Sequence, residues 1–129
     1  MKTCVLTITT TTDGQENTII RKGEMQLALS GIYLRYKEES ATVSLQIQGE
    51  TAQMDRQGDY SLHLALERGV VQKGSIGIAG AEGEVLTYAH KISYAQRTDS
   101  VLLLLHYDLD FGGEKQKMQL RILARKEGK

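Results

Sequence analysis

The chain has 129 residues, with 16 Lys and Arg balanced by 16 Asp and Glu, one Cys and no Pro. This length fits one domain, and a net charge of zero argues against a dedicated nucleic-acid or anionic-membrane binder. A single Cys cannot form an internal disulfide, no apolar run is long enough for a transmembrane helix, and the N-terminus lacks the apolar core of a signal peptide. We therefore expect a cytoplasmic protein.

The first half of the chain alternates between apolar and polar residues. Cys4, Leu6 and Ile8 share one parity, and Asp13-Gly14 predicts a hairpin turn. Alternation with a period of two is typical of strands that have one buried face. Further strands are expected over residues 15–29, 32–37, 42–48, 52–56 and 60–66, with turns at 30–31, 49–50 and 57–59.

The second half continues as strands after a turn at Arg68-Gly69. Four evenly spaced glycines follow, and they indicate either bends where a sheet curves or a flexible flap: Gly74, Gly77, Gly80 and Gly83. A hairpin is predicted at 81–83 and a long strand from about 84 to 97. One face of that strand is expected to carry Leu86, Tyr88, His90, Ile92 and Tyr94. Two more strands are expected, over residues 101–111 and about 118–122.

No stretch of the sequence shows a convincing helical stripe. About eight to ten strands joined by short turns suit a closed antiparallel barrel, which leaves no exposed sheet edge. No Pro-rich or low-complexity linker divides the chain. The sequence therefore predicts an all-β protein with a single antiparallel closed β-barrel domain over residues 1–129.

Three segments resemble the YwiB-like family of small bacterial proteins: 33–38 (YLRYKE), 54–58 (MDRQG) and 106–109 (HYDL). The resemblance covers residues 20–125 and implies a calycin-like (lipocalin-like) barrel. It implies no activity, because that family is uncharacterised. One departure is that Gly74 to Gly77 stand where the family usually has a Tyr-x-Thr element.

Several polar residues share the parity of the apolar set, so we expect them inside the barrel. The candidate ligand-binding residues of the lumen are Tyr36, Glu38, Arg56, Tyr60, His90, Tyr94 and Tyr107. Arg56 could recognise a carboxylate or phosphate, and Tyr and His groups could complete the site. The alternative is that these groups satisfy one another, with Arg56 and Glu38 as a structural ion pair.

Other patterns are expected on the outer surface. His106, Asp108 and Asp110 share a strand face but indicate only a solvated strand end, so no metal site or cofactor is predicted. Lys115, Lys117, Arg121 and Arg125 form a basic outer stripe on the last strand. Leu102 and Leu104 are the outward-pointing members of the apolar run 101–105, which favours an interface with a second copy or another partner.

The leading hypothesis is a non-enzymatic binding module that holds a small, partly apolar ligand in the barrel lumen. The alternative is an interaction or assembly module that uses the Leu102/Leu104 face or the basic last strand. A third hypothesis is an enzyme that pairs His90 with a carboxylate, although no catalytic motif supports it.

Overall fold

The computed structural model describes residues 1–128 and is all-β. It has ten strands, and no described residue is helical. The strands are β1 (Lys2–Thr12), β2 (Gln15–Ala28), β3 (Gly31–Glu38), β4 (Ala41–Gln48), β5 (Thr51–Gly58), β6 (Tyr60–Glu67), β7 (Val71–Ile78), β8 (Ala81–Gln96), β9 (Ser100–Phe111) and β10 (Glu114–Lys126). Consequently, the described chain offers no helix that could cross a membrane.

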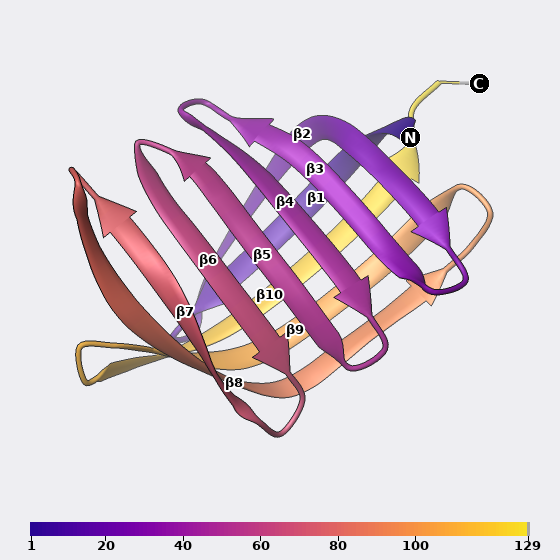
Figure 1. The fold of residues 1–129 in the computed structure, drawn as a ribbon. Coiled ribbons are helices and arrows are strands. Elements are labelled where there is room, and N and C mark those ends of the chain that lie inside the picture. Colours follow the sequence, from indigo (N-terminus) through magenta and orange to yellow (C-terminus); the bar gives the residue numbers. More distant parts are fainter. Residues whose placement is uncertain (129) are drawn as a thin grey trace.

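Each strand pairs antiparallel with the next along the chain, and β10 returns to pair with β1, so the sheet closes (Figure 1). This arrangement confirms the predicted closed antiparallel barrel and is consistent with the calycin-like fold that the family resemblance implies. The turns between β1 and β2, β3 and β4, β5 and β6, β7 and β8, and β9 and β10 all lie at one end, here called the hairpin end. Both termini lie at the opposite end.

The barrel interior is packed with aliphatic side chains. These residues are at most 2% exposed: Leu6, Ile8, Leu34, Leu45, Leu64, Leu103, Leu105 and Ile122. The alternation on β4 shows how the sequence selects them, because Ala41, Val43, Leu45 and Ile47 are buried while the residues between them face outward. Burial of this apolar set is the main favourable contribution to folding.

The wall is irregular where β6 meets β7. These strands pair only from Tyr60↔Ile78 to His63↔Ser75, and the rest of β6 approaches β8 directly. There the Thr87 hydroxyl donates a hydrogen bond of 2.6 Å to the carbonyl oxygen of Ala65. Gly74 lies directly before Ser75, at the point where the pairing of β7 with β6 ends. A Cβ atom at this position would overlap the carbonyl oxygen of His63, so the close approach of the two strands requires glycine.

Two sequence expectations for β8 are wrong. The hairpin before β8 turns at Ala79-Gly80, both with positive φ, and not at residues 81–83. More importantly, a β-bulge interrupts β8, since Ala89 pairs with Tyr107 and Lys91 with the adjacent His106. The extra residue reverses the parity of the strand, so that Thr87 and Ala89 face inward before the bulge while Ile92 and Tyr94 do so after it.

The close approach at Gly74 gives a stability prediction. Gly74→Ala should lower the free energy of unfolding by about 1–3 kcal/mol, because the new methyl group can be accommodated only by moving backbone. Gly83→Ala is the matched control, since its Cβ atom would lie 3.6 Å from the nearest side-chain atom, in ordinary contact. Urea denaturation of both variants measures the difference, and equal stabilities would contradict this account of β7.

Candidate functional site

A cavity of about 170 Å³ remains in the barrel at its hairpin end. Its walls come from strands that lie far apart in the sequence but are joined by closure of the sheet. The lining residues are Thr10, Tyr36, Glu38, Val43, Met54, Arg56, Tyr60, Leu62, Tyr107, Met118, Gln119 and Leu120. The structure thus brings together five of the seven predicted lumen residues: Tyr36, Glu38, Arg56, Tyr60 and Tyr107.

Arg56 is the buried charged group of this cavity, and it is only 9% exposed. Its Nη1 atom donates a hydrogen bond of 2.8 Å to the carbonyl oxygen of Tyr60 and lies 2.9 Å from Oδ1 of Asp59. Its Nη2 atom lies 3.9 Å from Oε2 of Glu38. The guanidinium carbon also sits 3.7 Å from the centre of the Tyr60 ring, within range of a cation–π interaction. The charge of the buried cation is therefore balanced by two carboxylates, Asp59 close by and Glu38 at longer range.

Asp59 is the partner that sequence reasoning missed. The tight turn between β5 and β6 brings it back to Arg56, three residues earlier, and its hydrogen bond to Arg56 lowers the pKa of the Asp59 carboxyl. Glu38 was predicted as the structural partner of Arg56, but its contact is the longer of the two. The spacing Arg-x-x-Asp across a predicted turn is the signal that could have found Asp59.

Tyr36 and Tyr107 supply the buried neutral polar groups of the cavity. Both side chains are buried, at 8% and 5% exposed. Burial raises the pKa of Tyr107 from 10.0 to about 12, and burial together with the nearby Glu38 charge raises the pKa of Tyr36 still further. No hydrogen bond within residues 1–128 contributes to either pKa. Both hydroxyls therefore stay protonated at physiological pH and can donate to water or a ligand.

Two methionines, Met54 and Met118, complete the apolar wall with Leu62 and Leu120. They have the inward parity of their strands, so the same alternation that selected Arg56 could have selected them. Methionine is flexible and polarisable, which lets the wall adapt to different apolar shapes.

His90 is not in the lumen, which corrects the sequence prediction. His90 follows the inward-facing Ala89 at the bulge, so its side chain points out of the barrel. There its Nε2 atom is 2.9 Å from Oδ2 of Asp108. Tyr88 lies beside it, with ring centres 5.0 Å apart. Tyr94 does point inward and packs against the core, but it does not line the cavity.

The other outward-facing patterns lie where the alternation placed them. His106, Asp108 and Asp110 all face outward from β9. A second His–carboxylate pair joins His63 Nδ1 to Asp55 Oδ1 at 2.6 Å. Within residues 1–128, no group of three His, Cys, Asp or Glu side chains is arranged to hold a metal ion.

Leu102 and Leu104 face outward from β9 and are partly buried by their neighbours. Leu102 belongs to a row of small and apolar residues across five strands, in register: Ala95, Leu102, Leu123, Thr7 and Ile20. Ile20, at the end of this row, is 64% exposed. Basic side chains of β10, including Arg121 and Arg125, flank the row.

Comparisons with known proteins agree on the fold and do not give a function. A family model described as a domain of unknown function, DUF1934, matches residues 3–122. The crystal structure of the ywiB protein from Bacillus subtilis is similar, with a TM-score of 0.84 and 16% sequence identity, over 98% of this chain and 93% of that chain. No curated protein sequence matches. The resemblance to the YwiB-like family is thereby confirmed.

The buried tyrosines give a prediction for alkaline pH. A tyrosine whose pKa is raised by folding stabilises the native state fully below pH 10, and this contribution is lost as the pH rises towards the folded-state value. Between pH 8 and pH 11, Tyr107→Phe should therefore lose about 1 kcal/mol less stability than the wild type.

Urea denaturation at the two pH values measures this difference. Between pH 6 and pH 8, where tyrosine does not titrate, the two proteins should change in parallel. An equal loss of stability at pH 11 would mean that Tyr107 is not buried as described.

Proposed function

We propose that this chain, which belongs to the DUF1934 family of unknown function, is a non-enzymatic binding module. The proposal rests on the geometry of the hairpin-end cavity. The single observation that supports this proposal is the cavity itself, where polar groups held by different strands converge on space that the packed core does not fill. The cytoplasmic location expected from the sequence stays part of the proposal.

The size of the cavity limits the ligand. Pockets for drug-sized molecules usually occupy about 300–1,000 Å³. A cavity of about 170 Å³ suits a fragment of one ring or a short chain, or the end group of a larger molecule whose remainder lies outside the barrel. The ligand is therefore smaller than an open lipocalin-like lumen would admit.

The chemistry of the walls suits a partly apolar and uncharged ligand. Met54, Leu62 and Leu120 provide the apolar contact, and the hydroxyls of Tyr36 and Tyr107 provide hydrogen-bond donors. Arg56 is already neutralised by Asp59 and Glu38, so an anionic ligand would have to displace one of these carboxylates. An uncharged ligand differs from the carboxylate or phosphate that the sequence suggested for Arg56.

The same walls favour binding over catalysis. The lining residues include no Cys, His or Lys, and their one carboxylate, Glu38, faces the Arg56 guanidinium at 3.9 Å, where a carboxylate is a weak base. His90, around which the enzyme hypothesis was built, lies outside with Asp108 and does not reach this cavity.

The methionines allow a direct test, because the chain has only four and their surroundings differ. In protein labelled with ¹³C at the methionine methyl groups, small probes such as phenol, indole and cyclohexanol should shift the signals of Met54 and Met118. Met25, which is fully buried in the core, and Met1, outside the cavity, are internal controls.

Tyr107→Phe should weaken the binding of phenol by about tenfold through loss of one hydrogen bond. Tyr33→Phe, which alters a tyrosine outside the cavity, should leave it unchanged. If none of the probes shifts Met54 or Met118 selectively, the proposal fails.

A second candidate function is assembly through the Leu102/Leu104 face. The observation that favours it is the row of small and apolar residues in register across five strands, from Ala95 to Ile20. A band of small and mostly apolar side chains on a sheet exterior is typical of an interface, and the basic residues of β10 would lie at its rim.

If this face forms a homodimer, Leu102→Glu should convert a dimer into a monomer in sedimentation equilibrium, because it places a charge within the row of apolar side chains, between Ala95 and Leu123. Gln53→Glu adds the same charge on the outside of β5, away from the row, and should leave the dimer intact. A wild-type protein that stays monomeric at high concentration would exclude the homodimer.

A further inference from the structure

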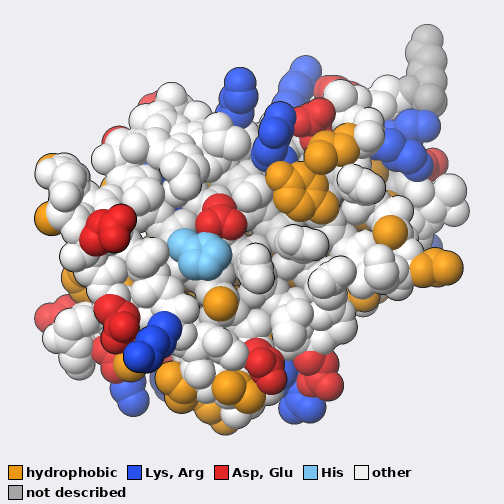
Figure 2. Space-filling model, in the orientation of Figure 1, with side chains coloured by type: hydrophobic (Ala, Val, Ile, Leu, Met, Phe, Trp, Pro, Cys, Tyr) orange, Lys and Arg blue, Asp and Glu red, His pale blue; other side chains and the backbone are white. Residues whose placement is uncertain are grey.

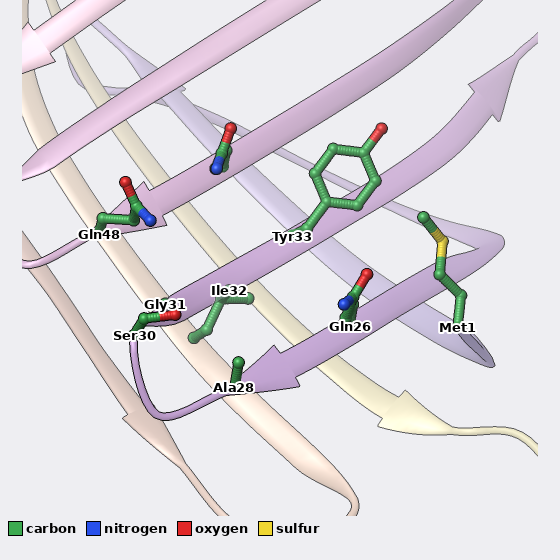
Figure 3. A pocket seen from close by; sticks show the side chains of 9 residues that line it. Met1, Gln26, Ala28, Ser30, Gly31, Ile32, Tyr33 and Gln48 are labelled. Atoms are coloured by element: carbon green, nitrogen blue, oxygen red, sulfur yellow. The ribbon is translucent and has the colours of Figure 1, made fainter.

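A second pocket lies on the outside of the barrel, beside the turn between β2 and β3, with a volume of about 320 Å³. Its lining residues are Met1, Gln26, Ala28, Ser30, Gly31, Ile32, Tyr33, Gln46 and Gln48. Figure 3 shows the ring of Tyr33 standing out from β3, with Gln26 on β2 and Gln48 at the end of β4 on the same side of the sheet. The pocket therefore combines one aromatic ring with several amide side chains.

The strand register fixes this combination. Tyr33 pairs with Gln26 of β2 and with Gln46 of β4, and Gln46 pairs in turn with Gln53 of β5. Side chains directly opposite each other on adjacent strands have Cβ atoms about 4.5–5.5 Å apart. The ring is thus flanked by an amide on each side, and the outward-facing Gln48 lies two residues beyond Gln46 on the same strand.

No side chain that lines this pocket carries a charge, and the one charged group of the lining residues is the N-terminal ammonium of Met1. The outward face of β4 consists only of neutral polar residues, which are Thr42, Ser44, Gln46 and Gln48. Figure 2 shows mostly uncharged side chains over the middle of this face, with Lys and Arg side chains along its upper border and an acidic side chain beside a histidine near its centre. The adjacent cation, Arg35, is held by Oε1 of Glu24 at 3.0 Å.

This chemistry selects one class of ligand. An amide both donates and accepts hydrogen bonds, as a sugar hydroxyl does, and a tyrosine ring offers a flat apolar surface with a polar tip. A nucleic acid would need several free cations beside the ring, whereas the lining supplies only the N-terminal ammonium group of Met1. The strand faces of some other small barrels hold oligosaccharides or oligonucleotides, and here the scarcity of cations favours the saccharide.

We propose that this outer pocket binds a neutral saccharide, with one sugar ring stacked on Tyr33 and its hydroxyls bonded to Gln26, Gln46 and Gln48. The proposal is independent of the hairpin-end cavity, which lies inside the barrel and shares no lining residue with this pocket. The protein would then carry two sites that differ in chemistry, one interior and partly apolar, the other exterior and rich in amides.

Saturation-transfer NMR with maltotriose, cellotriose and N-acetylated chitotriose tests the proposal. At least one of these probes should bind with a Kd tighter than about 10 mM, without dependence on salt because no charge is paired. Tyr33→Ala and Gln46→Ala should each weaken that binding by about tenfold. Tyr33→Phe keeps the stacking ring and should retain most of the affinity.

Two controls locate the binding. Tyr88→Ala removes an exposed tyrosine from β8, and Tyr107→Phe alters the interior cavity, so neither should change saccharide binding. The proposal is overturned if no saccharide binds, if Tyr33→Ala binds as well as the wild type, or if a single-stranded oligonucleotide or a peptide binds in place of every saccharide.

Discussion

The pairing of β1 with β10 is the interaction on which the rest of the structure depends. The first and last strands are in register from Cys4↔Lys126 to Thr12↔Met118, so the ends of the chain close the sheet. Closure leaves no free edge to recruit another strand, and it gives every strand one inner and one outer face. It also places Thr10 of β1 and Met118 of β10 beside Tyr36 and Arg56, which lie far away in the sequence.

Closure also explains why the interior cavity is small and lies at one end. Long aliphatic side chains from all sides meet in the middle of the barrel and fill it. Towards the hairpin end the inward positions carry Tyr36, Arg56 and Tyr107, whose polar ends need partners or solvent and cannot pack as tightly. Arg56 finds its partners in Asp59, Glu38 and the carbonyl of Tyr60, while the two hydroxyls are left to the cavity.

The period-two alternation predicts most of the strands, the barrel and five residues of the cavity, but the glycine-spaced region of β7 carried no clear strand pattern. The alternation failed at His90 because the segment around the bulge carries apolar or aromatic residues on both parities, so that either face of β8 looks like the inner one. A bulge changes the register by a backbone irregularity that leaves no residue signature here. Asp59 was missed for another reason, since its contact with Arg56 depends on a turn and not on strand parity.

The central claim is that the space bounded by Tyr36, Tyr107 and Arg56 exists in the native barrel and is open to small molecules. A high-resolution crystal structure of the protein purified without denaturation tests it most directly. We predict ordered water or ligand density within hydrogen-bonding distance of the Tyr36 and Tyr107 hydroxyls, with Arg56 held by Asp59. A barrel in which Met54 and Met118 close over this space and both hydroxyls bond to protein atoms would contradict the account.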